Sequence, residues 1–79
     1  MSKYDWSKIP RDILFVATDQ DGFGYGYYKK PRLPIDKDSG RWSSKQRDIA
    51  YFLIKPNNNP AVDYHRGWHW TRTLEERPK

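Results

Sequence analysis

Asp63, His65 and His69 lie close together near the end of the chain and could face one metal ion. His65 and His69 are four residues apart, but without cysteine or a further ligand the set is incomplete for zinc. No nucleophile and no carboxylate pair stands beside these residues to complete an acid–base site. We therefore expect a protein that has no catalytic activity, no metal and no cofactor.

Two acidic stretches, residues 19–22 and 36–40, begin with the Asp-x-Asp spacing of calcium loops. An EF-hand loop also needs a bidentate Glu at its closing position. The closing positions here are Lys30 and Arg47, whose charge is wrong for calcium. Both stretches are therefore expected to be turns.

Glycine and aromatic residues alternate in Asp21–Tyr28, which reads DGFGYGYY. This is not a phosphate loop, because a phosphate loop must be followed by a helix. The segment is similar to the aromatic strand of RNA-recognition motifs and cold-shock domains, where glycines keep the strand flat and rings stack on bases. It departs from the RNA-recognition pattern at Asp21, where that pattern has a basic residue, and at Gly26, where it has an aliphatic one.

Two binding hypotheses follow from the aromatic and basic residues. The first is docking on another protein, because Trp, Tyr and Arg dominate interface energetics. Its candidate residues are Tyr25, Tyr27, Trp42, Trp68, Trp70 and Arg72. The alternative is single-stranded nucleic-acid binding, in which hairpin rings stack on bases and cations contact phosphate. Its candidate residues are Phe23, Tyr25, Tyr27, Lys29, Lys30 and Arg32.

The composition limits the class of protein. The 79 residues carry a net charge of +5, which permits binding to nucleic acid or to an acidic protein surface. The absence of cysteine excludes disulfides and thiolate metal sites and fits a reducing cytosol. No apolar run approaches membrane length, so we expect a cytoplasmic protein with no membrane partner. The oligomeric state stays open.

The element that must position these residues is a hairpin over residues 12–28. An Asp-Gly pair between two β-prone runs is the strongest short-range hairpin signal. With Asp21 and Gly22 as the central residues of a two-residue turn, Val16 would face Tyr27. We expect an α+β or mainly β fold, a twisted antiparallel sheet of three or four strands centred on this hairpin, with little helix.

The remaining segments complete one domain over residues 1–79. Residues 1–11 are expected to be an extended arm that Trp6 and Ile9 anchor to the hairpin. A capping box at residues 43–46 and apolar helical spacing favour a helix, but the run over residues 49–55 favours a strand, which we prefer. Residues 67–76 contain either a short strand over 67–71 or a helical turn over 71–76, and residues 75–79 are expected to be a flexible tail.

Three short motifs extend over most of the chain. They are Trp6-x-x-Ile9-Pro10, Ala17-Thr18-Asp19-x-Asp21-Gly22 and Trp70-x-x-Thr73-Leu74-x-x-Arg77-Pro78. Together they resemble a loose group of small proteins encoded by tailed bacteriophages. The resemblance implies a phage accessory factor inside a bacterial host, which modulates or inhibits a host macromolecule of the defence, transcription or replication machinery. It carries no functional residue with it.

Overall fold

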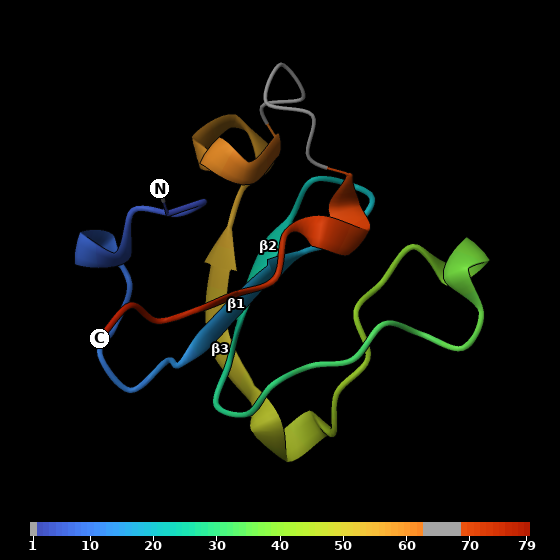
Figure 1. The fold of residues 1–79 in the computed structure, drawn as a ribbon, viewed down its shortest axis with the longest axis horizontal. Helices are drawn as coiled ribbons and strands as arrows, with labels where there is room; N and C mark the ends of the chain where they lie inside the picture. Colours follow the sequence, from blue (N-terminus) through green and yellow to red (C-terminus); the bar gives the residue numbers. More distant parts are fainter. Residues whose placement is uncertain (1, 63–68) are drawn as a thin grey trace.

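The computed structural model describes residues 2–62 and 69–79, and these residues form a four-stranded antiparallel sheet (Figure 1). The strands are β1 (Phe15–Thr18), β2 (Gly24–Tyr27), β3 (Ile49–Ile54) and β4 (Glu75–Glu76), and their order in the sheet is β3-β2-β1-β4. Within the same residues the helical segments are short 3-10 turns: η1 (Trp6–Lys8), η2 (Lys37–Ser39), η3 (Gln46–Asp48), η4 (Pro56–Asn58), η5 (Pro60–Val62) and η7 (Trp70–Arg72). The predicted small antiparallel sheet with a central hairpin is confirmed. None of the helices in these ranges is long and apolar enough to cross a membrane.

The hairpin lies where the sequence predicts it, but the predicted register is wrong by one residue. Val16 pairs with Gly26, not with Tyr27. Asp19 N–H donates to the Phe23 carbonyl at 3.0 Å, so the connection is a three-residue loop, and its last residue, Gly22, has a φ of 92°. This is the loop in which a type I turn is followed by a left-handed residue. Because side chains alternate along a strand, the shift places different residues on each face of the sheet.

The register defines two faces of the hairpin. We call the face of Val16, Thr18, Gly24 and Gly26 the arm face. We call the opposite face, which carries Phe15, Ala17, Tyr25 and Tyr27, the tyrosine face.

The arm face is covered by the N-terminal arm and by η5. Its buried apolar cluster consists of Tyr4, Ile9, Ile13, Val16, Ala50 and Ala61, with Trp6, Phe52 and Ile54 packed against it. A Cβ atom at Gly26 would lie 2.9 Å from Ile13 Cδ1, so the glycine is needed for this close approach. The arm is anchored by Trp6 and Ile9 as predicted, although η1 interrupts the expected extended conformation.

A buried polar cluster joins the arm to the rest of the core. Tyr4 OH donates to the Thr73 carbonyl at 2.8 Å and lies 2.9 Å from Thr18 Oγ1. Thr18 N–H donates to Thr73 Oγ1 at 2.8 Å, and Asn59 Nδ2 donates to Thr18 Oγ1 at 3.0 Å. Every buried polar atom of this cluster has a partner, as a buried network requires.

The segment after residue 72 returns to the hairpin, and Figure 1 shows it in red alongside β1. Glu76 pairs with Phe15 and Glu75 with Val16, which makes β4 the edge strand beside β1. Arg77 Nε donates to the Ile13 carbonyl at 2.9 Å, and its Nη2 donates to the carbonyls of Ile9 and Pro10. The prediction of a flexible tail over residues 75–79 is therefore wrong for Glu75 to Arg77.

Two segments with open alternatives are resolved by the sheet. The preferred strand over residues 49–55 is confirmed as β3, with the 3-10 turn η3 in place of a longer helix before it. In the segment 67–76, residues 67 and 68 lie outside the described ranges. The turn η7 covers Trp70–Arg72, so the predicted strand over 67–71 is wrong at residues 70 and 71. The predicted helical turn over 71–76 is wrong at Glu75–Glu76, which form the strand β4 instead.

Candidate functional site

Trp42 is the residue around which the candidate site is built. Its backbone N–H donates to Asp19 Oδ1 at 2.9 Å, and its Nε1 donates to the Thr18 carbonyl at 3.0 Å. Its ring also meets the Trp70 ring edge to face, with centroids 6.4 Å apart and an interplanar angle of 88°. The indole nitrogen is thus satisfied inside the protein, which leaves the half-buried ring as a fixed apolar surface.

Asp19 is buried beneath this tryptophan. Burial raises the pKa of its carboxyl group above the ordinary value, and the nearby charge of Asp21 acts in the same direction. The hydrogen bond from Trp42 N–H and the charge of Arg41 oppose the rise in pKa. Asp19 is therefore a positioning residue for the loop that carries Trp42.

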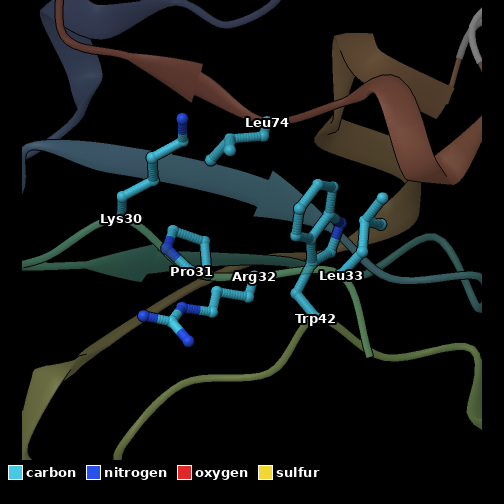
Figure 2. Close-up of a pocket in the computed structure, with 6 residues that line it drawn as sticks. All are labelled: Lys30, Pro31, Arg32, Leu33, Trp42 and Leu74. Atoms are coloured by element: carbon cyan, nitrogen blue, oxygen red, sulfur yellow. The ribbon is translucent and has the colours of Figure 1, made fainter. Parts of the chain in front are cut away.

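An apolar depression of about 570 Å³ lies against the Trp42 ring (Figure 2). Its lining residues are Lys30, Pro31, Arg32, Leu33, Trp42 and Leu74. The two sides of the connecting loop are held together there, because Arg32 N–H donates to the Ser43 carbonyl and Ser43 N–H donates to the Arg32 carbonyl, both at 2.8 Å. Pro31 is fully buried, so this part of the loop is fixed to the body of the protein.

A cationic groove of about 470 Å³ adjoins the depression and shares Lys30 and Arg32 with it. Its lining residues are Lys29, Lys30, Arg32, Ser43, Ser44, Lys45 and Asp48. The groove is thus lined by four cationic residues, one acidic residue and two serines. This combination suits an anionic ligand, because the cations attract it and the hydroxyls can donate to its oxygens.

The residues predicted for protein docking are only partly accessible. Trp42 and Tyr25 are half-buried and Arg72 is exposed, whereas Trp68 lies outside the described residues. Tyr27 is 3% exposed and Trp70 is 6% exposed, so neither ring is accessible to a partner in this fold. Both rings are used in the core, because a small sheet needs their large apolar area for its own packing.

The residues predicted for nucleic-acid binding divide into two groups. Lys29, Lys30 and Arg32 are exposed and line the cationic groove together. The hairpin rings do not form the predicted platform, since Tyr27 is sealed and Phe23 and Tyr25 are half-buried. Burial also raises the pKa of the Tyr27 hydroxyl well above its ordinary value.

Sequence reasoning did not identify two parts of the accessible surface. Leu33 and Leu74 belong to the depression, although they lie 41 positions apart and no local pattern links them. The side chains of Ile49, Tyr51 and Leu53 are also exposed on β3. The signal for this second set was the strict alternation along the strand, in which these residues face outward while Ala50 is buried.

The predicted absence of a metal site is not tested for Asp63 and His65, which lie outside the described residues. His69 is exposed, and its Nδ1 accepts from Thr71 N–H at 3.3 Å. Among residues 2–62 and 69–79, no three His, Cys, Asp or Glu side chains are grouped to hold a metal ion.

Comparisons with protein-family models, with curated proteins and with solved structures each find no match to this chain.

Proposed function

We propose that the chain is a non-catalytic binding protein that docks on an acidic surface of another protein through the Trp42 depression. The observation that carries this proposal is the pairing of a fixed apolar depression with four cations in the adjoining groove. A buried aromatic anchor surrounded by polar residues is the arrangement that dominates interface energetics. The cations supply orientation and a faster association with an acidic partner.

The biological setting of the proposal is that of a phage accessory factor. The three short motifs that resemble tailed-phage proteins support this setting. In it, the partner is a host protein of the defence, transcription or replication machinery, and docking modulates or inhibits that protein inside the bacterial cytoplasm.

A capture experiment with matched charge variants tests the proposal. The chain is immobilised, exposed to bacterial lysate with and without nuclease treatment, and compared with the variant Lys30→Glu/Arg32→Glu. We expect this variant to lose its captured protein, because charge reversal at the rim repels an acidic surface. The control is Arg11→Glu/Lys79→Glu, which changes the net charge equally at exposed positions outside the depression and the groove.

The proposal is wrong if both variants capture the same proteins as the wild type. It is also wrong if every captured protein disappears when the lysate is treated with nuclease.

Single-stranded nucleic-acid binding is the second candidate function, and one observation favours it. Lys29, Lys30, Arg32 and Lys45 line the same groove as the hydroxyls of Ser43 and Ser44, which is a suitable path for a phosphate backbone. Without Tyr27, base stacking would depend on the half-buried rings of Tyr25 and Trp42.

Fluorescence anisotropy with a labelled oligonucleotide separates the two functions. For nucleic acid, we expect affinity to fall steeply with salt, because each neutralised phosphate releases a counterion. Tyr25→Ala should weaken the complex, since stacking contributes about 1–3 kcal/mol per base. Binding that is independent of salt, or unchanged by Tyr25→Ala, would exclude this candidate.

A further inference from the structure

The edge strand β3 is the most exposed apolar element of the described fold. It has the sequence IAYFLI, which contains no charged residue, and β2 pairs with it on one side only. Tyr51 is 107% exposed, and the neighbouring outward-facing residues Ile49 and Leu53 are also among the exposed large apolar side chains. Tyr25 extends the row, because it pairs with Leu53 on the same face of the sheet.

Edge strands of this kind are usually protected. Soluble proteins place a lysine, a proline, a bulge or a covering segment on an exposed edge, because its free N–H and C=O groups can pair with another chain. Here the outward row carries no charge, and Pro56 lies beyond the end of β3. β3 carries one of these features, because the register shift between the pairs Tyr25–Leu53 and Tyr27–Ile49 places extra residues in β3 and bends the strand.

The charges at the two ends of β3 indicate what can pair with it. Lys45 and Arg47 precede the strand and Lys55 follows it, and all three side chains are exposed. The acidic residue at this end, Asp48, lines the cationic groove together with Lys29 and Lys30. An uncharged strand with cations at both ends is complementary to an extended segment that has an apolar centre and acidic ends.

The same charges oppose the pairing of β3 with a second copy of the chain. Two copies related by a twofold axis would pair antiparallel, with Tyr51 opposite Tyr51 of the second copy. Ile49 would then lie opposite Leu53 of the second copy, and the cations that flank β3, Arg47 in η3 and Lys55 after the strand, would come together at both ends. Like charges that are brought together are destabilising, and each copy also carries a net charge of +5.

We propose that β3 accepts a fifth strand from a partner protein. The incoming strand is an extended segment with alternating apolar residues and acidic residues at both ends. Its backbone pairs with the open edge of β3, and its apolar side chains cover Ile49, Tyr51 and Leu53. The proposal rests on the proposed function for the class of partner, and it adds a second contact surface beyond the Trp42 depression.

A synthetic peptide tests this edge without a lysate. The probe has two glutamates at each end and three Val-Thr repeats between them, about ten residues, which is enough to span the strand. Its binding is measured by fluorescence anisotropy at several salt concentrations. A second probe has the same sequence with alternate backbone nitrogens methylated, and a third has lysines in place of the glutamates.

A matched pair of variants locates the binding. Tyr51→Lys places a charge in the middle of the edge, whereas Ile35→Lys makes the same kind of change at a residue that is 108% exposed in the connecting loop. Because both side chains are wholly exposed, we expect both variants to keep the thermal midpoint of the wild type. Tyr51→Lys should weaken the glutamate probe by about tenfold or more, and Ile35→Lys should leave its affinity unchanged.

The remaining outcomes are also decisive. We expect binding to be lost with the methylated probe, with the lysine probe and at high salt. These losses support strand pairing at a cationic edge. Equal binding of the methylated probe, or equal affinity of Tyr51→Lys and the wild type, would overturn it. A dimer that sedimentation velocity detects and that Tyr51→Lys abolishes would also overturn it, because the second copy would then be the occupant.

The peptide and lysate experiments fail separately. If the probe does not bind and lysate capture still depends on Lys30 and Arg32, only the fifth-strand proposal is wrong. If the probe binds but lysate capture does not depend on Lys30 and Arg32, the proposed docking through the Trp42 depression is wrong and the fifth-strand proposal stands.

Discussion

Tyr4 is a single side chain that links three segments of the chain. Its hydroxyl group contacts Thr18 of β1 and the carbonyl of Thr73, which precedes β4, and its ring meets the Trp6 ring edge to face at 6.4 Å. Burial is the main cause that raises the pKa of the hydroxyl from 10.0 to about 12. The side chain therefore contributes to stability in a way that depends on pH.

Tyr4→Phe should lower the free energy of unfolding at pH 7 by about 1–3 kcal/mol, because the buried Thr73 carbonyl loses its donor. The folded state holds the Tyr4 proton more tightly than the unfolded state. The contribution is therefore complete below pH 10 and is lost as the pH rises towards about 12. Urea unfolding between pH 7 and pH 11 should show a smaller alkaline loss in Tyr4→Phe, with contributions remaining from Tyr27 and Tyr25, whose pKa values burial also raises. Identical alkaline curves for the two proteins would contradict this assignment.

Asp19 gives a second prediction at this scale. Asp19→Asn keeps an oxygen acceptor for Trp42 N–H and removes a charge that burial disfavours, so it should match or exceed the wild type in stability at pH 7. Asp19→Ala leaves the N–H without a partner and should cost about 1–3 kcal/mol. Because the folded pKa is raised, the carboxyl of the wild type favours folding at low pH, and this gain is lost as the pH rises through the folded pKa. The free energy of unfolding of the wild type, relative to that of Asp19→Asn, should therefore fall from pH 3 to pH 7. A difference that does not change with pH would refute this prediction.

At the scale of elements, the glycines of β2 are explained by packing on the arm face. Gly26 lies against Ile13 and Phe52, and Gly24 lies against Asn59 and Ile54. The sequence pattern permitted a flat floor for a ligand, but the side chains of Ile13, Asn59 and β3 occupy the space above these glycines. The glycines that alternate with aromatic residues in β2 therefore make room for the close packing of core side chains.

Gly26→Ala should destabilise the protein by about 1–3 kcal/mol, because the new Cβ would lie 2.9 Å from Ile13 Cδ1 and 3.0 Å from Ile13 Cγ2. Ile13→Val removes the Cδ1 atom, so the double variant should lose less stability than the sum of the two single variants. A double-mutant cycle from urea unfolding measures this coupling. Strict additivity would show that the two residues do not compete for the same space.

Elements with a local signal could be predicted, and those that depend on distant contacts could not. The hairpin and β3 have β-prone runs bounded by Gly, Pro and Asn, and both were placed correctly. The register was missed because Gln20-Asp21-Gly22 supports a three-residue loop as well as Asp-Gly supports a two-residue turn. β4 was missed because two glutamates carry no strand signal, and it exists through pairing with Phe15 and Val16.

The candidate site was predictable in Trp42 and in its cations, but not in its other apolar residues. Lys29, Lys30 and Arg32 are adjacent in sequence, so their grouping follows from the chain itself. Whether a ring is accessible depends on segments far away in sequence: Trp70 packs against Trp42, and Tyr27 is buried in the core. The sequence pattern does not show whether a given ring is buried or accessible, because each aromatic residue is equally suited to a core and to an interface.

At the scale of the whole molecule, Arg77 connects the two ends of the described fold. Its guanidinium group donates to the carbonyls of Ile9, Pro10 and Ile13 and lies 4.8 Å from the centre of the Trp6 ring. Glu75 adds to the connection by accepting from Trp6 Nε1 at 2.7 Å. Residues of the first and third motifs thus meet in one structural contact.

Arg77→Lys should lower the free energy of unfolding by about 2–3 kcal/mol, nearly as much as Arg77→Ala, because a lysine cannot place donors on three carbonyls in this geometry. Thermal unfolding monitored by circular dichroism measures the loss. The control is Arg72→Ala, an exposed residue, which should change stability by less than about 0.5 kcal/mol. If Arg77→Lys were as stable as the wild type, the positive charge alone, and not the several N–H donors of the guanidinium group, would hold the two ends of the fold together.

The contact between residues 75–77 and residues 9–16 also determines when the fold can form during synthesis. Bonds such as Arg77 Nε to the Ile13 carbonyl join positions 64 residues apart. Loops of this length close slowly, and native pairing at such separation lowers folding rates. On the ribosome, β1 must wait without its β4 neighbour until the last strand has left the exit tunnel. Until then both long edges of the nascent sheet are open, so a chaperone that binds extended strands has its best opportunity before residue 77 emerges.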